Sequence, residues 1–491
     1  MRNVTRHSLM LIASFFVTAG LNYAFGVTLS WFFLPDQFGV LGVAQSLLLL
    51  TALVVGSGFA WTAAHDLAAE GPTARTRRRF RATWTANVLL GLLLAAGLEG
   101  AYLLGALPLG PSYRLIVPLV GLTTVLLAAR AVINGAARGL YRFGPVALNL
   151  AGEVVVKVIV GLALVALGGG VTGVMVGFAL GTAIALAHSL WIVRPAGLWH
   201  GAGWFDRQAV VATAPLFLGM LGPALMLNLD ILGLKLLAPA GQGDAMAGLY
   251  QAAIILARTP VFIAQSLTLV LFSYVAGSRA GERAGTTSRY REAAVRAWAR
   301  LLLPAGLVLA LAPQTALTLL FPAHYRAAAP ALRLAAVGGL LLALVTLLNG
   351  LFQAAGDRRR PALAAGLAII AQVAVLVGLV PRWGTPGAAL SLLVAGTVAL
   401  MGLAPTILHR SVPSRRPTAI VPLVEGALPL VGLALPLMLL PEGGRGAALV
   451  KLALAGLSYL AFLLIFRLRP ANRPHRPGVH PLVRLLQALM G

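Results

Sequence analysis

Residues 145–193 read PVALNLAGEVVVKVIVGLALVALGGGVTGVMVGFALGTAIALAHSLWIV. The stretch holds two apolar runs, 145–168 and 171–193, in which only Glu153 and Lys157 are charged and which meet at consecutive glycines. A helix of roughly 20 apolar residues crosses the hydrocarbon core of a bilayer, and glycine readily ends a helix in a sharp turn. The stretch therefore predicts a hairpin of two membrane-spanning helices.

The same pattern continues along the whole chain of 491 residues, of which 59% are hydrophobic and 10% charged, with a mean hydropathy of +0.89. A soluble domain of this length cannot bury so much apolar surface. We therefore expect an all-α polytopic membrane protein with about fourteen transmembrane helices and short connections. The predicted spans are 8–33, 38–64, 82–107, 113–137, 145–168, 171–193, 209–237, 247–275, 297–321, 328–356, 362–381, 386–408, 419–440 and 445–466.

The predicted membrane topology explains the net charge of +25. Such a charge in a soluble protein would suggest nucleic acid, but most of the 38 Lys and Arg residues fall in alternate loops, which lie on one side of the membrane. Basic loops stay on the cytoplasmic side. The sequence therefore predicts a multi-pass protein of the inner (cytoplasmic) membrane with both termini in the cytoplasm and no nucleic-acid partner.

Short motifs recur between spans that are six helices apart, which indicates a parallel repeat of two six-helix halves. The matched pairs are Asn134-Gly135 with Asn349-Gly350, Gly170-x-x-Gly173 with Gly384-x-x-Gly387, and Phe38-Gly39-Val40 with Ala247-Gly248-Leu249-Tyr250. Two similar halves can rock against each other and open a central site to either face, so the repeat favours transport. The predicted organisation is an N-terminal six-helix bundle (1–207), a second six-helix bundle (208–410), two additional transmembrane helices (411–466) and a basic cytoplasmic tail (467–491).

Several of these elements resemble motifs of the polysaccharide or O-antigen flippases, a family of the multidrug/oligosaccharidyl-lipid/polysaccharide (MOP) superfamily. The similar elements are Leu34-Pro35-Asp36-Gln37-Phe38-Gly39, Asn228-x-Asp230 followed by Ala247-Gly248-Leu249-Tyr250, Phe321-Pro322-x-x-Tyr325-x-x-Ala328, and Gly384-Thr385-Pro386-Gly387-Ala388-Ala389. The chain departs from the family at the inside end of the second span, where His65-Asp66 stands in place of frequent basic residues.

The resemblance implies a transporter that flips a polyprenyl-diphosphate-linked oligosaccharide to the outer leaflet, coupled to an ion gradient. The implied partners are this lipid-linked substrate and membrane lipid. The resemblance leaves open whether a polysaccharide polymerase or ligase is a protein partner. Two alternatives share the fold: a small-molecule or multidrug exporter and a lipid II flippase. A membrane polymerase or ligase would need a sizeable external loop with catalytic Arg and His, and the predicted external loops are short, so no enzyme and no catalytic residue is expected.

Cations inside the predicted spans are candidates for substrate binding, because a charge in hydrocarbon is costly and by default suggests function. Arg258 lies near the middle of the predicted span 247–275. Pro260 follows two residues later and should kink the helix. The planar guanidinium group of Arg258 suits a diphosphate or an acidic sugar. A structural ion pair with Asp230 would explain a buried arginine here equally well. Arg130 and Lys157 are the further candidates. Arg130 lies close enough to the inside end of its span that its side chain could instead reach the interface.

Acids inside the spans are candidates for ion coupling. Asp230 could bind a proton or a hard cation, or pair structurally with Arg258. Glu153 and Lys157 are spaced i, i+4 and can pair on one helix face. That pair is either structural or lines the cavity, where protons or substrate could open it.

Cofactor chemistry finds no support in the sequence. The chain has no cysteine and no cluster of histidines with metal-ligand spacing, and we find no glycine-rich phosphate loop. We therefore expect no cofactor and no metal, and His188 is interpreted as a histidine whose ring bonds a backbone carbonyl.

Overall fold

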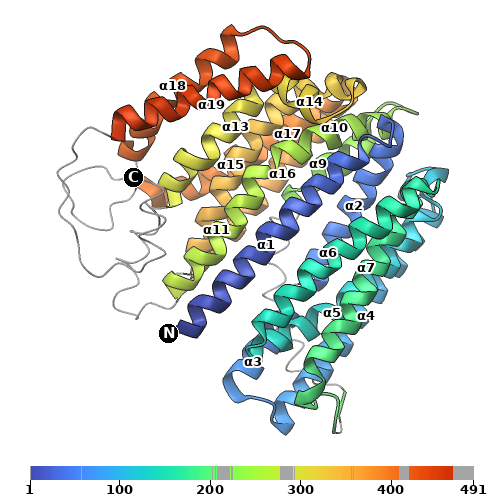
Figure 1. Ribbon diagram of the computed structural model, residues 1–491. Coiled ribbons are helices and arrows are strands. Elements are labelled where there is room, and N and C mark those ends of the chain that lie inside the picture. Colours follow the sequence, from blue (N-terminus) through green and yellow to red (C-terminus); the bar gives the residue numbers. More distant parts are fainter. Residues whose placement is uncertain are drawn as a thin grey trace. The chain divides into compact units, whose positions relative to one another are not determined.

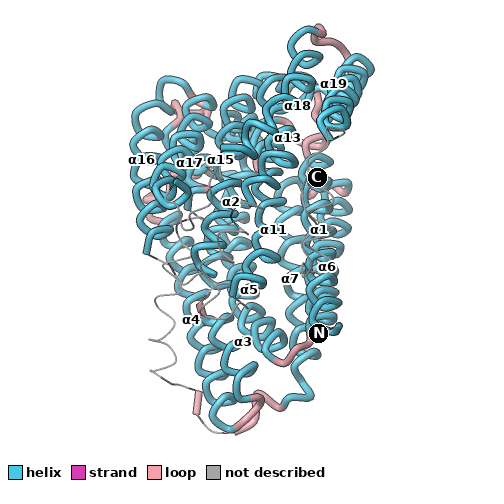
Figure 2. The backbone as a smooth tube through the Cα atoms, turned by 90° about the vertical axis from the view of Figure 1, so that its left-hand side faces the viewer, coloured by secondary structure: helices cyan, strands magenta, loops and turns pink. Residues whose placement is uncertain are grey.

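A computed structural model describes residues 2–56, 58–201, 203–204, 206, 222, 225–276, 291, 294–354, 357, 359–408 and 420–467. Within these ranges the chain is helical and contains no strand (Figure 1). The predicted hairpin is present as α6 (Phe143–Ala166) and α7 (Gly170–Val193), which lie side by side in Figures 1 and 2. Gly168 and Gly170 adopt positive φ angles of 85° and 54° at the turn, a conformation that favours glycine.

The described residues include nine helices long and apolar enough to cross a membrane, or up to ten if α10 (Gly243–Ala257) and the start of α11 (Thr259–Ala276) form one broken span. The prediction of an all-α multi-pass membrane protein is therefore confirmed, whereas the count of fourteen stays a prediction. Most of the predicted span 209–237, the tail after residue 467 and the predicted boundaries at 207 and 410 lie outside the described residues.

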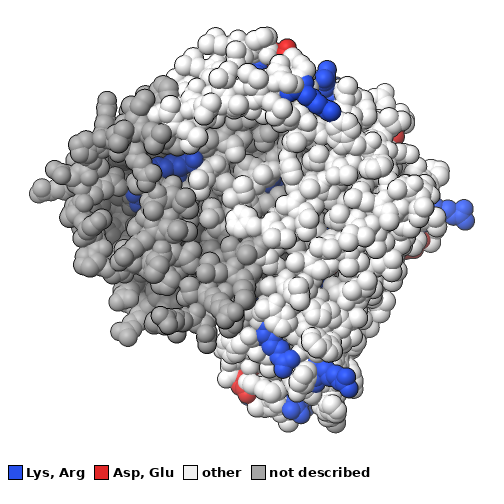
Figure 3. All heavy atoms as spheres, in the orientation of Figure 1, with Lys and Arg blue, Asp and Glu red and all other residues white. Residues whose placement is uncertain are grey.

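The pattern of exposure agrees with a lipid environment. Large apolar side chains such as Leu93, Ile159 and Ile370 are 62–70% exposed, while polar residues such as Asn87 and Asp230 are fully buried. Exposed apolar area on this scale would drive a soluble protein to aggregate. In Figure 3 the described part of the visible face is nearly free of charged atoms over its middle.

Clustering of contacts divides the chain into two compact units, of which the first comprises Met1–Ile255 and Ala365–Ala395. Within it α4 packs along α5, α6 along α7, and α3 and α7 against α5. Its further elements are α1 (Arg2–Leu29), α2 (Pro35–Gly56), α3 (Phe59–Glu70), α4 (Ala74–Leu103), the 3-10 turns η1 (Pro111–Tyr113) and η2 (Arg194–Ala196), α5 (Ile116–Gly139), α9 (Leu229–Leu237), and parts of α10, α16 (Arg359–Trp383) and α17 (Thr385–Leu408).

Close helix crossings in this unit occur at glycines of the sequence motifs. A Cβ atom on Gly39 of α2 would collide with the backbone oxygen of Asp244, and one on Gly248 of α10 would collide with the backbone oxygen of Pro35. The two backbones therefore touch where the motifs Phe38-Gly39 and Ala247-Gly248 stand. Small residues permit such approaches in membrane proteins.

The second unit comprises Leu256–Ala364 and Gly396–Gly491. Within it α11 packs along α15 (Ala329–Ala354), and α18 (Ile420–Leu439) with α19 (Arg445–Arg467) forms a hairpin against α13 (Leu303–Leu311) and α14 (Pro313–Leu320). The π-helix η4 (Trp298–Leu302) precedes α13, and the 3-10 turn η5 (Ala323–Ala328) precedes α15. The Tyr459 hydroxyl of α19 donates a hydrogen bond of 2.9 Å to the carbonyl of Arg300 in η4, which fixes the hairpin.

Candidate functional site

One face of α6 carries three polar residues at successive i, i+4 positions: Asn149, Glu153 and Lys157. Residues with this spacing lie above one another on a helix. Each of them contacts a polar side chain of a neighbouring helix in the first unit, so a polar column runs along α6 between α1, α5 and α7. We call these residues and their partners the α6 column.

Arg130 and Glu153 form an ion pair in the middle of this column. The Arg130 Nη1 atom of α5 lies 2.5 Å from Glu153 Oε2, and Thr182 of α7 donates to Glu153 Oε1 over 3.1 Å. The two side chains are only 9% and 17% exposed. Arg130 therefore points into the bundle and does not reach for the interface. Its Nε atom is buried without a hydrogen-bond partner, so the guanidinium has a donor to spare.

Lys157 lies one turn further along α6. Its ammonium donates a hydrogen bond to the side-chain oxygen of Asn22 in α1 and lies 4.5 Å from the centroid of the Phe178 ring, a cation–π distance. Among the described residues no carboxylate is within ion-pair distance of Lys157, and Glu153 pairs with Arg130. The suggested i, i+4 pair of Glu153 and Lys157 is therefore not formed.

The part of α6 near Asn149 holds a neutral network that the sequence did not reveal. Asn149 Nδ2 donates to Ser189 Oγ over 2.7 Å and to Asn134 Oδ1 over 3.3 Å, and Ser189 lies 2.9 Å from Asn134 Oδ1. His188 Nδ1 meets the side-chain oxygen of Asn149 at 3.2 Å, so its partner is an amide side chain and not the expected backbone carbonyl. The network joins α5, α6 and α7.

The predicted internal repeat offers a comparison for this column. The repeat offsets bring Arg130, Glu153 and Lys157 into correspondence with apolar residues of the second half: Val345, Leu367 and Ala371. The matched positions of the predicted second half are apolar, so the repeat pattern does not require these charges. Charges that are costly to bury and that the repeat pattern does not require are candidates for function.

A second buried acid joins two of the sequence motifs. Asp230 is fully buried in the first turn of α9, where the helix dipole favours negative charge. Its carboxylate accepts a hydrogen bond of 2.8 Å from the Tyr250 hydroxyl and one of 2.9 Å from the backbone N–H of Ile231. The motifs Asn228-x-Asp230 and Ala247-Gly248-Leu249-Tyr250 therefore meet through this bond.

Lys235, at the other end of α9, forms its ion pair with Asp244. Lys235 Nζ lies 2.7 Å from Asp244 Oδ1, which also accepts a hydrogen bond of 2.8 Å from the Tyr113 hydroxyl. Lys235 lies over the Tyr113 ring at 5.2 Å. These contacts give Lys235 a structural role in joining α9, α10 and η1.

Arg258 belongs to the second unit and lies at the break between α10 and α11, where its side chain is buried. The expected interruption before Pro260 is confirmed: the carbonyl of Arg258 accepts from the N–H groups of Val261 and Phe262 at 3.0 and 3.1 Å. Over the described residues no group of three or more His, Cys, Asp or Glu could hold a metal ion.

The Tyr250–Asp230 bond can be tested directly. Tyr250→Phe should lower the free energy of unfolding by about 1.5–3 kcal/mol, the typical value for a hydrogen bond to a charged group, because Asp230 stays buried and loses one donor. The measurement is thermal or denaturant unfolding of the purified chain in detergent. The matched control is Tyr102→Phe, which removes an exposed hydrogen bond to Gly110. Equal stability of the two variants would show that the bond to Asp230 is weak.

Comparison with known proteins places the chain in a family. Residues 4–276 match the family model described as "Polysaccharide biosynthesis protein". A search of curated proteins finds no match. A solved structure of the lipid II flippase MurJ in an inward closed conformation is 14% identical with a TM-score of 0.74, over 94% of this chain and 98% of MurJ.

Two transporters of the MOP superfamily are similar as well. An inward-facing multidrug resistance MATE transporter is 13% identical with a TM-score of 0.62, over 86% of this chain and 98% of its own. A MOP transporter from Pyrococcus furiosus is 14% identical with a TM-score of 0.56, over 88% of this chain and 96% of its own. The chain belongs to the polysaccharide biosynthesis protein family and has the fold of MOP superfamily transporters.

Proposed function

We propose that this protein flips a polyprenyl-diphosphate-linked oligosaccharide from the cytoplasmic to the outer leaflet of the cytoplasmic membrane, with both termini in the cytoplasm. The family description supports a role in polysaccharide synthesis, and the fold is shared with a protein named as a lipid II flippase. A lipid-linked sugar made on one side of a membrane has to cross it before it can serve surface polysaccharide. A polymerase or ligase would then consume the product.

The observation that carries the proposal is the pair of buried cations in the α6 column. Arg130 and Lys157 are both 8% exposed and stand on neighbouring helices of one bundle. A diphosphate is the part of the proposed substrate that most needs such donors, and a guanidinium binds it through two parallel hydrogen bonds. We assign Arg130 and Lys157 to the substrate's diphosphate. Arg258, in the second unit, is a separate candidate for contact with the diphosphate or an acidic sugar.

The ion pair suggests how transport would be coupled to an ion. Glu153 and a phosphate compete for the same guanidinium, so a substrate that binds Arg130 releases the Glu153 carboxylate in an apolar setting. A carboxylate left there is costly, and uptake of a proton removes the charge. Glu153 is therefore the first candidate for ion coupling. Asp230 is the second candidate for ion coupling.

Other substrates would use the same fold. A lipid II flippase would present the same diphosphate to the same cations, so the glycan alone separates it from the main proposal. A multidrug exporter is favoured by the similarity to the MATE transporter. For cationic drugs, however, a cavity needs acids and not cations. The Pyrococcus furiosus transporter is described as having a binding pocket of reversed polarity that suggests a different function, so polarity separates substrates within this fold.

Deletion of the gene in its host tests the proposal. We expect a complete lipid-linked repeat unit to accumulate on the cytoplasmic leaflet while surface polysaccharide disappears, measured by extraction and mass spectrometry of polyprenyl-diphosphate glycans. The wild-type gene should reverse both effects. Lys157→Gln, Arg258→Ala and Asp230→Asn should insert normally and fail to reverse them. The matched control is Lys451→Gln, which removes another buried lysine, bonded to Glu442 in the second unit.

Each outcome has a clear meaning. Intact surface glycan without accumulation would contradict the flippase proposal and favour the exporter. Accumulation of the peptidoglycan precursor would identify lipid II as the substrate. Full activity of the Lys157, Arg258 and Asp230 variants would reject the assigned site and leave the substrate class standing.

A further inference from the structure

The first two turns of α4 carry five arginines, which is an unusual place for them. Arg75, Arg77, Arg78, Arg79 and Arg81 follow directly on the N-cap Thr73. The N-terminus of a helix is its positive end, and cations there are unfavourable. Arginines spaced three and four apart also repel one another. Among the described residues, acids of α3 and loop carbonyls contact three of these five arginines, Arg75, Arg79 and Arg81.

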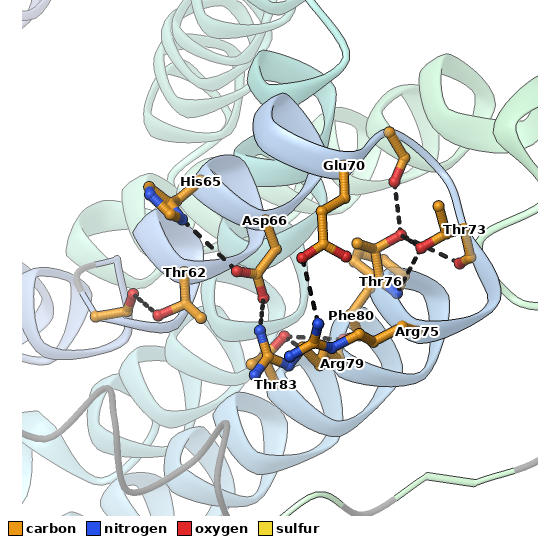
Figure 4. A network of polar contacts seen from close by, with 12 residues as sticks. Thr62, His65, Asp66, Glu70, Thr73, Arg75, Thr76, Arg79, Phe80 and Thr83 are labelled. Atoms are coloured by element: carbon orange, nitrogen blue, oxygen red, sulfur yellow. Dashed lines mark hydrogen bonds and ion pairs between the residues drawn. The ribbon is translucent and has the colours of Figure 1, made fainter.

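Two of the arginines are neutralised by acids of α3. Figure 4 shows Arg79 and Arg75 reaching across to Asp66 and Glu70. The Arg79–Asp66 and Arg75–Glu70 distances are 3.4 and 3.6 Å. The two acids are spaced i, i+4, so they face α4 together. The α3–α4 hairpin is thus closed by two ion pairs on one side of α4.

Arg81 is solvated by the loop that follows α7. It is 1% exposed and donates to the carbonyls of Leu198, His200 and Gly203. Gly201 and Gly203 have φ angles of 107° and 88°, which only glycine adopts easily. The loop therefore folds over the side of α4 opposite to α3, and its backbone is shaped around the arginines.

Arg77 and Arg78 remain without a carboxylate. Within the described part of the chain neither forms an ion pair, and the buried Nε atom of Arg77 has no hydrogen-bond partner. Both lie beside the same loop: a Cβ on Gly197 would be 3.9 Å from Arg77 Cζ, and one on Gly203 would be 3.2 Å from Arg78 Nε. Arg77 and Arg78 thus each lie beside this loop with donors that no carboxylate of the described residues accepts.

Tryptophans mark the depth of this pair in the membrane. Trp84, Trp199 and Trp204 form one cluster, with ring centroids of Trp84 and Trp199 5.0 Å apart and those of Trp199 and Trp204 6.3 Å apart. Trp204 is 49% exposed, and Trp191, near the end of α7, is 67% exposed. Tryptophan is enriched at the level of the lipid headgroups. The pair also lies in the first two turns of the helix Ala74–Leu103, a candidate membrane span whose apolar part follows these arginines.

We propose that Arg77 and Arg78 bind the phosphate of an anionic phospholipid whose acyl chains lie against Trp204 and the apolar surface beside it. A lipid is the ligand that meets both features at once, because its phosphate needs the guanidinium donors and its chains need the exposed aromatic surface. Figure 3 shows basic side chains gathered at this lower end of the molecule, bordering the uncharged surface. The bound lipid offsets the charge at the start of α4 and fixes the depth of the α3–α4 hairpin. The site is separate from the α6 column.

The test uses the full chain in vesicles that contain brominated phosphatidylglycerol or brominated phosphatidylcholine. Bromine quenches nearby tryptophan, and the difference between the chain and its Trp204→Phe variant isolates the signal of Trp204. We expect phosphatidylglycerol to quench Trp204 more strongly. Each arginine near an anionic surface contributes roughly a fivefold preference, so Arg77→Gln/Arg78→Gln should lower the relative affinity for phosphatidylglycerol on the order of 25-fold.

The matched control is Arg75→Gln/Arg79→Gln, which removes the same charge from the same two turns but from arginines already paired with acids. It should keep most of the preference. If both double variants lost the same share of the preference for phosphatidylglycerol, the site would be overturned. The preference would then come from the summed positive charge of all the arginines. Arg78→Gln alone changes an exposed side chain and cannot disturb folding greatly, and it should lose roughly fivefold. A free-phosphate site would be indicated if inorganic phosphate, unlike chloride at equal ionic strength, abolished the preference.

Discussion

Gly39→Ala is expected to prevent the protein from accumulating in a folded form. The added methyl group would fall on the backbone oxygen of Asp244, and a backbone cannot move aside as a side chain can. The α2–α10 crossing would have to open, at a cost of at least about 3 kcal/mol, the upper end for overpacking. A chain whose stability is within the usual range of about 5–15 kcal/mol would lose a large share of it.

The measurement is the yield of monodisperse protein in mild detergent and its thermal unfolding midpoint. Gly248→Ala should have a similar effect, because it meets the same crossing from the other helix. The control is Gly97→Ala in α4, whose Cβ would meet nothing within 4 Å. That change should be neutral or stabilise the helix by up to about 1 kcal/mol. Normal yield of Gly39→Ala would show that the two helices are further apart than described.

Hydropathy predicts the helices of this protein well because the membrane imposes one strong rule. A span has to satisfy its backbone internally and be apolar over its length. The turn at Gly168 to Gly170 therefore falls where the sequence places it. The motif glycines Gly39 and Gly248 also indicate a close helix crossing, because only residues without a side chain allow the two backbones to touch.

The polar partners could not be predicted in the same way. The sequence shows that Glu153 and Lys157 are costly to bury, but local spacing suggests the wrong partner for each. Glu153 bonds Arg130 of another helix, and Lys157 bonds Asn22, which is 135 positions away. Asn134, Asn149 and Ser189 carry no charge, so nothing in the sequence marks them as a network. Partner choice depends on which helix faces meet, and hydropathy does not specify this.

The Arg130–Glu153 pair allows stability and transport to be separated. Glu153→Leu leaves the Arg130 guanidinium buried without its carboxylate and should lower the free energy of unfolding by about 3–5 kcal/mol. Arg130→Val/Glu153→Leu introduces the residue types that the predicted repeat matches to these positions, Val345 and Leu367. Because the double variant leaves no buried charge without its partner, it should recover much of the stability that Glu153→Leu loses.

Transport should behave differently from stability in these two variants. If Arg130 binds the diphosphate and Glu153 couples transport to an ion, the double variant regains stability but not flipping, measured as surface polysaccharide in the deletion host. Thermal unfolding in detergent gives the stability of each variant from the same preparation. A stable double variant that restores surface polysaccharide would show that the pair only holds α5 against α6. A stable and inactive one would mean that transport, and not stability, requires the charged pair.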